Sequence, residues 1–382
     1  MENVVIIGSG LAGYTLAKEL RKLAPALPIR MLTLDDGASY SKPMLSNALA
    51  KGKTAQSLAM ASAEQMEAQL NITITTDTAV TAINTQTHTL ATAMEEIPYG
   101  KLVLCVGAEP IRPPLVGDAA DRVLSVNNLV DYAVFRDVLE TARRVAIIGP
   151  GLIGCEFAND LLSVGKQVVV IGPGAAPLDR LLPTEAGAAL QDAMARQGVA
   201  WHLGATALRV DHQNESYRIT LSDGGTLHAD VVLSAVGLRP NLHLAALAGL
   251  RTARGIVVNR HLQTSAPDVY ALGDCAEVEG LVLPFVMPIM HAARALAPTL
   301  AGTLTAVNYP AMPVVVKTPA CPVVVSPPAP DAAGEWRIEH VDGGGVRALY
   351  RGDDGRLLGF ALTGAAAAER QAWSKELPPV LA

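Results

Sequence analysis

Short apolar runs alternate with helix-like amphipathic segments along most of this chain. Residues 4–7 and 145–148 are uninterrupted apolar runs, as in a strand that is buried on both faces of a parallel sheet. Each run is followed by apolar residues at helical spacing, namely Leu16, Ala17 and Leu20 after the first and Phe157, Ala158, Leu161 and Leu162 after the second. The pattern predicts two strand–helix units and therefore an α/β fold.

The same pattern places further elements around both units. Strands are predicted at residues 29–34, 72–75, 79–83, 102–106, 168–171 and 231–237, and a helix at residues 184–197. The strand predicted at 269–274 follows the second unit in sequence but ends in an acidic residue that belongs with the first. The second unit is therefore expected to be inserted into the first.

The last part of the chain has a different character. Prolines are dense between residues 310 and 330, and short strands at 336–339, 346–350 and 357–362 surround Gly-rich turns. We therefore expect three domains. They are a discontinuous first domain (1–108 and 243–309), an inserted second domain (109–242) and a small α+β C-terminal domain (310–382).

A glycine fingerprint joins strand to helix in both units. It reads Gly8-Ser9-Gly10-Leu11-Ala12-Gly13 in the first and Gly149-Pro150-Gly151-Leu152-Ile153-Gly154 in the second. The first glycine permits the tight turn, the second lets a pyrophosphate approach the backbone, and the third lets helix and strand pack closely. The sequence thus predicts two Rossmann-like domains that each bind a dinucleotide; the alternative is two strand–turn–helix units without a ligand.

The two units differ where their second strand ends. In the first, Asp35 and Asp36 lie about 20 residues beyond the glycines, where a carboxylate can accept hydrogen bonds from ribose hydroxyls. In the second, the strand ends in Ile171-Gly172-Pro173-Gly174, which has neither an acid nor a nearby arginine for a 2′-phosphate. Arg180 could reach this place only if the loop folded back.

Composition and charge exclude several classes of function. Of the 382 residues, 50% are hydrophobic and 17% are charged, which is typical of a globular protein, and the net charge of −6 with no basic run argues against nucleic acid as a partner. Residues 281–304 are apolar but are interrupted by prolines, a histidine and an arginine, so a membrane span is not expected. The first strand begins at Val4 with no preceding leader, which favours a cytoplasmic protein.

Cysteine and histidine spacing predicts no thiol redox centre and no metal site. The four cysteines are Cys105, Cys155, Cys275 and Cys321, and no two of them form a CxxC or other close pair. The eight histidines are scattered, with none at metal-ligand spacing. Three of the four cysteines lie beside apolar strand ends or helix starts, where we expect a free cysteine to be a small buried hydrophobe.

Taken together, these motifs resemble the FAD-dependent pyridine nucleotide–disulfide oxidoreductases, and the resemblance covers the whole chain. It rests on the two fingerprints, on Leu102-Val103-Leu104-Cys105-Val106-Gly107-Ala108-Glu109-Pro110, on Ser234-Ala235-Val236-Gly237-Leu238-Arg239-Pro240 and on Tyr270-Ala271-Leu272-Gly273-Asp274-Cys275-Ala276. The resemblance implies non-covalent FAD in the first domain and NADH in the second.

The segment after the first unit points to one branch of that family. Disulfide reductases carry a cysteine pair there, whereas this chain has Tyr40-Ser41-Lys42-Pro43-Met44-Leu45-Ser46. With the run from Val314 to Pro322, this looks like the NADH:rubredoxin reductases of bacterial alkane oxidation. The resemblance implies hydride transfer from NADH to FAD, followed by single-electron transfer to rubredoxin, a small acidic iron protein that binds transiently. The alternatives are a ferredoxin reductase of a dioxygenase or monooxygenase system, and a nucleotide-binding redox sensor without turnover.

The resemblance also implies roles for single residues, each with a structural alternative. Lys42 and Glu156 are expected to pair beside the flavin as catalytic groups, although a solvated loop charge and a favourable charge near a helix N-terminus are the plainer interpretations. Asp274 is expected on the ribityl chain, or as a helix N-cap. Val286 lies before a helix expected at 289–296, whose start faces the flavin. Lys317 is expected at the flavin O2 edge, or on an outward-facing edge strand.

The complete set of cofactor contacts implied by the resemblance is as follows. The FAD contacts are Gly8, Gly10, Leu11, Ala12, Gly13, Asp35, Asp36, Lys42, Val80, Gly107, Asp274, Val286 and Lys317, and the NAD contacts are Gly149, Gly151, Leu152, Ile153, Gly154, Glu156 and Gly237.

Overall fold

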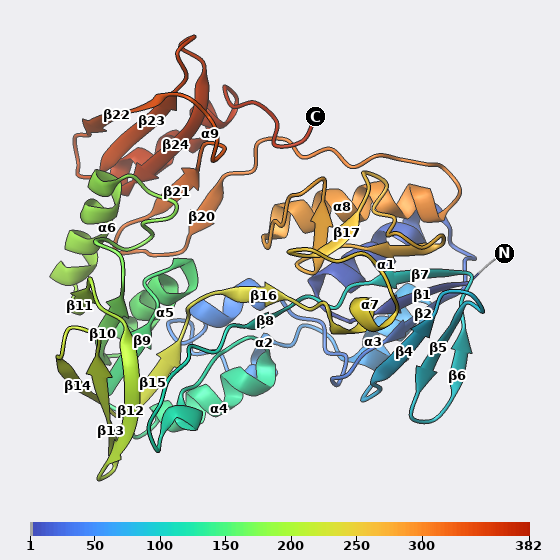
Figure 1. The fold of residues 1–382 in the computed structure, drawn as a ribbon, viewed down its shortest axis with the longest axis horizontal. Coiled ribbons are helices and arrows are strands. Elements are labelled where there is room, and N and C mark those ends of the chain that lie inside the picture. Colours follow the sequence, from blue (N-terminus) through green and yellow to red (C-terminus); the bar gives the residue numbers. More distant parts are fainter. Residues whose placement is uncertain (1–2) are drawn as a thin grey trace.

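A five-stranded parallel sheet forms the centre of the first part of the molecule (Figure 1). The computed structural model describes residues 3–382. The strands lie in the order β18-β7-β1-β2-β3, with bounds β1 Val4–Ile7, β2 Ile29–Leu32, β3 Thr73–Thr75, β7 Lys101–Leu104 and β18 Val269–Ala271. Strand β18 pairs with β7 although the whole second unit lies between them in sequence. The first sheet is therefore completed only after the chain has passed through the second.

Helices and short strands cover this sheet. They are α1 Leu11–Leu23, α3 Ala63–Leu70, α7 His243–Leu247 and α8 Val286–Leu300, with the parallel pair β17 Ile256–Val258 and β19 Ala276–Val278. Helices α1 and α8 pack against each other, and their apolar faces, including Leu16, Leu20 and Leu296, are buried in one core with β1 and β7. This packing brings the start of α8 towards the middle of the molecule (Figure 1).

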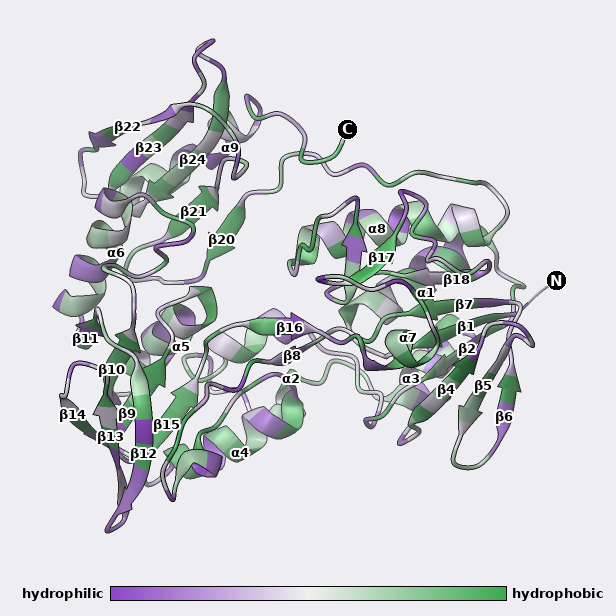
Figure 2. Cartoon of the chain, in the orientation of Figure 1, coloured by the Kyte–Doolittle hydropathy of each residue, from purple (hydrophilic) through white to green (hydrophobic). Residues whose placement is uncertain are grey.

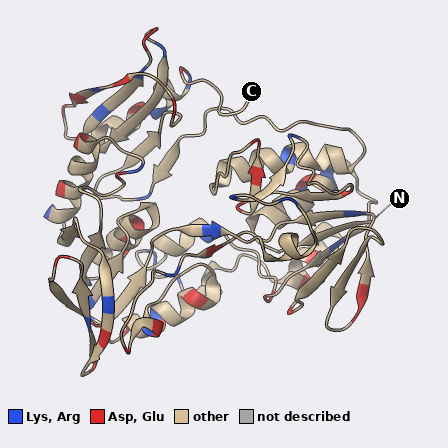
Figure 3. Cartoon of the chain, in the orientation of Figure 1, with Lys and Arg blue, Asp and Glu red and all other residues tan. Residues whose placement is uncertain are grey.

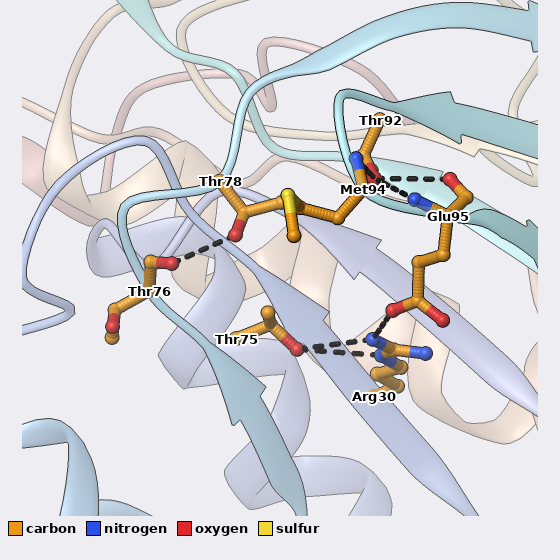
Figure 4. A network of polar contacts seen from close by, with 7 residues as sticks. All are labelled: Arg30, Thr75, Thr76, Thr78, Thr92, Met94 and Glu95. Carbon is orange, nitrogen blue, oxygen red and sulfur yellow. Dashed lines mark hydrogen bonds and ion pairs between the residues drawn. The ribbon is translucent and has the colours of Figure 1, made fainter.

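A small antiparallel sheet is attached to the edge of the first sheet by Arg30 (Figure 4). Its strands are β4 Val80–Asn84, β5 Thr89–Thr92 and β6 Glu96–Pro98. The Arg30 guanidinium on β2 donates to Thr75 Oγ1 at 3.3 Å and pairs with Glu95 in the β5–β6 turn. Thr92 Oγ1 accepts from the Met94 and Glu95 amides and closes that turn.

A four-stranded parallel sheet forms the centre of the second unit. Its order is β11-β10-β9-β15, with bounds β9 Arg144–Ile148, β10 Gln167–Gly172, β11 Val199–Leu203 and β15 Val231–Ser234. The remaining elements are α4 Leu129–Leu139, α5 Leu152–Ser163, α6 Thr184–Arg196, η2 Ala120–Arg122 and the antiparallel strands β12 Ala207–Gln213, β13 Ser216–Leu221 and β14 Thr226–Ala229. Two early elements, η1 Lys42–Asn47 and α2 Ala55–Leu58, contribute apolar residues to the core of this unit rather than to the first.

The two units are joined by a two-stranded ribbon in the middle of Figure 1. Strand β8 Ala108–Pro110 leaves the first unit, strand β16 Leu238–Pro240 returns to it, and the two pair antiparallel. Gly237 O accepts from the Ile111 amide and Gly107 O from the Asn241 amide, both at 3.0 Å. The paired crossing strands therefore fix both units at one junction.

A five-stranded antiparallel sheet makes the C-terminal part. Its order is β20-β21-β24-β23-β22, with bounds β20 Val314–Val316, β21 Val323–Ser326, β22 Glu335–His340, β23 Val346–Arg351 and β24 Leu357–Thr363, followed by η3 Gly364–Glu369 and α9 Arg370–Ser374. Val316, Cys321 and Val323 share a core with α5 and α6 of the second unit. The chain end returns to the first unit, where Leu381 pairs with Tyr309.

Hydropathy and charge follow this architecture. The inner strands of the parallel sheets are mainly hydrophobic, whereas the outer strand β22 has more hydrophilic positions (Figure 2). Acidic and basic positions are interspersed along the chain (Figure 3). Within residues 3–382, no helix is long and apolar enough to cross a bilayer.

The predicted elements form with modest shifts at their ends. The strand expected at 102–106 ends at Leu104, because Gly107 takes a positive φ of 65° and the chain turns. The helix expected at 289–296 extends from Val286 to Leu300. The predicted α/β fold is confirmed, because each of the two units is a parallel sheet with helices packed against it.

Candidate functional site

The first and third glycines of both fingerprints are required by the protein's own backbone. Gly8 and Gly149 have φ of 108° and 112°, a region that side chains disfavour. A Cβ on Gly8 would lie 2.4 Å from Cys105 O, and one on Gly149 would lie 2.5 Å from Ala235 O. These two positions would be glycine even if no ligand were bound.

The third glycine seats the helix on the strand. A Cβ on Gly13 would lie 2.0 Å from Gly8 O, and a Cβ on Gly154 would lie 1.9 Å from Gly149 O. Contacts below 3.0 Å to backbone cannot be relieved by side-chain movement. Helix α1 and helix α5 can therefore approach β1 and β9 only because these residues have no side chain.

The middle glycines behave differently. A Cβ on Gly10 would meet nothing within 4 Å, and one on Gly151 would meet only Ala235 O at 3.9 Å. Both residues have extended backbone and precede a helix that has no side-chain cap. The first amide groups of α1 and α5, at Leu11, Ala12, Leu152 and Ile153, have no acceptor within their own helix. Open space in front of free N–H groups fits an anion such as a pyrophosphate.

The first unit carries an oriented carboxylate beside this space. Asp35 Oδ1 accepts hydrogen bonds from Thr33 Oγ1 at 2.6 Å, Ser9 Oγ at 3.0 Å and the Gly37 amide at 3.1 Å. Asp36 accepts from the Ala38 amide instead. Three donors on one oxygen fix the Asp35 side chain and leave Oδ2 available for a ribose, which distinguishes Asp35 from Asp36.

Asp274 and Lys42 are two partly buried residues whose opposite charges interact. A Cβ on Gly273 would lie 2.8 Å from Ala12 Cβ, so the turn after β18 packs directly against the first fingerprint helix. Burial raises the pKa of Asp274, and the Lys42 ammonium opposes that rise. Burial lowers the pKa of Lys42, and Asp274 and Asp131 oppose that fall. The two groups stabilise each other's charged form beside the turn that leads from β1 into α1. We call this turn with the α1 N-terminus the first cradle, and the corresponding turn from β9 into α5 the second cradle.

The expected Lys42–Glu156 pair is not formed. Glu156 on α5 is 2% exposed, and its Oε2 lies 2.8 Å from Lys317 Nζ, while Ser46 donates to the same oxygen. Its other oxygen accepts from the Lys317 amide at 2.9 Å. The expectation was wrong because the C-terminal sheet packs on α5 and brings Lys317 to Glu156.

Lys317 therefore joins three parts of the molecule. Its ammonium bonds to Glu156 of the second unit, and to Pro43 O and Ser46 Oγ of η1. Lys317 follows β20 directly and is half-buried, so the alternative of an outward-pointing edge-strand lysine does not hold. The ion pair also satisfies a carboxylate that would otherwise be costly to bury.

Two residues that the motifs did not indicate add to the contacts between η1 and α5. Ser46 bridges η1 to Glu156, and Asp160, one turn further along α5, accepts from the Leu49 and Ala50 amides at 2.9 Å. Burial raises the pKa of Asp160, against these two hydrogen bonds. The four-residue spacing of Glu156 and Asp160 on a helix that is otherwise largely apolar was the available signal.

The remaining predicted contacts lie on three different parts of the fold. Gly107 and Gly237 stand at the two ends of the crossing ribbon, with φ of 65° and 120°. Val286 begins α8 and is 40% exposed. Val80 lies at the start of β4, half-buried against the first core.

The cysteines take no part in this site. All four are free and buried. Burial raises the pKa of Cys155 and Cys275 to about 12, and also raises that of Cys105 and Cys321. Buried thiols of raised pKa are poor nucleophiles. Residues 3–382 also contain no cluster of three side chains suited to a metal ion.

Comparisons with known families, sequences and structures show which proteins this chain is similar to. Residues 2–297 match the family described as pyridine nucleotide-disulphide oxidoreductase, and residues 306–377 match the rubredoxin binding C-terminal domain. The chain is 50% identical to a rubredoxin-NAD(+) reductase of Alcanivorax borkumensis, over 100% of both chains, and 47% identical to one of Acinetobacter baylyi, over 100% of this chain and 99% of that one. A ferredoxin reductase structure from Rhodopseudomonas palustris superposes with a TM-score of 0.88 at 26% identity, covering 99% of this chain and 96% of that one.

Proposed function

The chain belongs to the pyridine nucleotide-disulphide oxidoreductase family, and from this premise we propose that it is an NADH:rubredoxin oxidoreductase with non-covalently bound FAD. The observation that carries the proposal is the pair of matched cradles. In both, the first and third glycines are required by packing, while the middle glycine, Gly10 or Gly151, faces open space at a helix N-terminus. Close approach of a pyrophosphate to the backbone accounts for glycine at those two positions.

The first cradle suits FAD. The α1 N-terminus faces the pyrophosphate, Asp35 the adenosine ribose, and Asp274 the hydroxyls of the ribityl chain. Lys42 stands opposite Asp274 and supplies a cation beside the ring system. The uncapped start of α8 adds partial positive charge on the same side, and this favours the reduced, electron-rich ring.

The second cradle suits NADH. Gly151 and the α5 N-terminus face its pyrophosphate, and Gly237 at the crossing ribbon leaves room for its nicotinamide to reach the first cradle. Bound FAD supplies the redox chemistry, since it accepts a hydride and releases electrons singly. The chain's own contribution is positioning: the Glu156–Lys317–Ser46 network locks η1, α5 and β20 together where the two ligands meet.

We propose that the acceptor is an external protein. No thiol pair is available to store electrons, and the C-terminal sheet matches the rubredoxin binding domain. That sheet carries a groove of about 350 Å³ lined by Pro313, Val315 and Val324 and bordered by Arg370 and Lys375. Val315 lies two residues before Lys317 in the sequence. An apolar floor with basic edges suits a small acidic iron protein, and an alkane hydroxylase would be the consumer of its electrons.

Rapid-mixing kinetics test the proposal. NADH should reduce the bound flavin at a rate that hardly changes with salt, whereas rubredoxin reduction should slow as ionic strength rises. Rapid flavin reduction with negligible rubredoxin reduction, and rapid ferredoxin reduction in its place, would transfer the assignment to a ferredoxin reductase. Absence of turnover with either acceptor would favour a redox sensor.

The groove can be tested in the same assay. Replacing Arg370 and Lys375 with Glu should slow rubredoxin reduction at low salt by about 10-fold or more and leave flavin reduction unchanged. Arg356→Glu makes a charge reversal of the same kind on an 83% exposed side chain of the same sheet and serves as control. Equal effects of both changes would show that net charge, not the groove, guides the partner.

A further inference from the structure

The second unit cannot carry an acid at the end of its second strand. The residue there is Gly172, and a Cβ on it would lie 2.2 Å from Cδ and 2.3 Å from Cγ of Pro150. Pro150 is the second residue of the fingerprint, where the first unit has Ser9. The rigid pyrrolidine ring thus occupies the space from which a carboxylate at position 172 would extend. The absence of an acid at the strand end follows from the fingerprint itself.

The loop after β10 folds back over that place. The Leu178 amide donates to Pro150 O at 3.0 Å, and Leu178 O accepts from the Leu181 and Leu182 amides at 2.8 and 2.9 Å. Leu178 is 3% exposed and has a φ of 57°, which is unusual for a bulky side chain and requires the surrounding contacts to hold it. The backbone of this loop is therefore tied to the fingerprint turn.

Folding of the loop brings Asp179 to the strand end. A Cβ on Gly174 would lie 2.0 Å from Asp179 Oδ2, so the carboxylate rests directly over the residues that follow β10. Asp179 and Arg180 are both exposed. Among the residues that the structure describes, none donates a hydrogen bond to the Asp179 carboxylate or forms an ion pair with it.

We infer that Asp179 supplies the ribose-binding carboxylate of the second unit and selects NADH over NADPH. This inference rests on the proposed function. Two hydroxyls on the adenosine ribose of NADH can donate to one carboxylate, as at Asp35 in the first unit. A 2′-phosphate removes one of those donors and places a dianion against Asp179. Arg180 would act in the opposite sense, since a guanidinium favours a 2′-phosphate.

The test measures binding without turnover. Calorimetric titration of the FAD-loaded protein with ADP-ribose and with its 2′-phosphorylated form reports only the adenosine end of the nucleotide. In Asp179→Asn, the Kd for ADP-ribose should rise about 10-fold, because a charge-assisted hydrogen bond is lost, while the phosphorylated probe should bind the same or more tightly. Arg180→Gln is the matched control and should leave the ADP-ribose Kd unchanged.

The outcomes separate the inference from the function on which it rests. An unchanged ratio of the two Kd values in Asp179→Asn would overturn the inference. Tighter binding of the phosphorylated probe by the unaltered protein, lost in Arg180→Gln, would also overturn it, because Arg180 would then be the selecting residue. If the unaltered protein bound neither probe, the proposed nicotinamide function itself would fail.

Discussion

The two glycine-fingerprint units share their turn geometry but differ at the end of their second strand. In the first, Asp35 lies close behind β2 and is oriented by three donors. In the second, Pro150 crowds the strand end, and the carboxylate of Asp179 reaches it from a loop that folds back. The fingerprint therefore determines the turn in both units, whereas the segment that brings a carboxylate to the strand end differs between them.

The cradles also differ in their charged neighbours. In the first, the charges of Lys42 and Asp274 interact although the two residues are far apart in sequence, and in the second, Glu156 pairs with Lys317 of the C-terminal sheet. Each pair crosses a boundary between parts of the chain. A ligand in either cradle is therefore surrounded by groups that are in place only once the whole chain has packed.

The largest expected effect separates packing glycines from ligand glycines. Gly154→Ala places a Cβ 1.9 Å from Gly149 O and should lower the free energy of unfolding by about 3 kcal/mol. Gly151→Ala meets no close atom and should change it by about 1 kcal/mol or less while weakening NADH binding. Urea unfolding and ADP-ribose titration measure the two effects. Equal destabilisation by both changes would contradict the distinction.

The next largest expected effect is weaker binding of FAD. Asp274→Ala should weaken FAD binding at least about 10-fold, because it removes a charged acceptor of hydrogen bonds. Flavin absorbance after dialysis measures this loss. The same variant should retain ADP-ribose affinity, and Asp179→Asn should retain FAD, so the pair forms a reciprocal control. Full retention of FAD by Asp274→Ala would remove this residue from the first cradle.

A double-mutant cycle distinguishes the two possible partners of Glu156. The cycle of Glu156→Gln with Lys317→Met should show a coupling of about 1 kcal/mol in unfolding free energy, since the ion pair is half-buried. The cycle with Lys42→Met should show almost none. A larger coupling to Lys42 would restore the pairing that the family resemblance implies.

The smallest expected effect concerns acid stability. Asp230 accepts from the Arg143 and Arg144 amides and pairs with the Arg144 side chain, whereas in the first unit the neutral Asn3 accepts from the Gly100 amide. Burial alone would raise the pKa of Asp230, but these hydrogen bonds lower it to about 2.

A depressed pKa adds stability above the unfolded value and loses it as pH falls through the folded one. Asp230→Asn should therefore lower the free energy of unfolding by about 1 kcal/mol at pH 7 and by almost nothing near pH 2. The effect at pH 7 is this small because Arg144 is 44% exposed and solvent screens the ion pair. Urea midpoints measured across this range check the trend. A cost that stays constant down to pH 2 would show that the ion pair contributes nothing.

Much of this protein was determined by short stretches of sequence. The strands β1 and β9, both fingerprints and the return of β18 to the first sheet could be predicted, because close-packed turns and buried strands need particular residues at neighbouring positions. The family resemblance drawn from these motifs is confirmed. A tight turn or a buried strand requires particular residues at neighbouring positions. Such requirements can therefore be recognised from the sequence without coordinates.

Only the tertiary structure decided which charged groups meet. Lys317 and Glu156 are 161 residues apart, and they pair because the C-terminal sheet packs on α5. Asp179 reaches the end of β10 because the Leu178 amide bonds to Pro150 O. A lysine or aspartate in sequence shows its charge but not its neighbours. Long-range packing selects the partner, and packing depends on the whole chain.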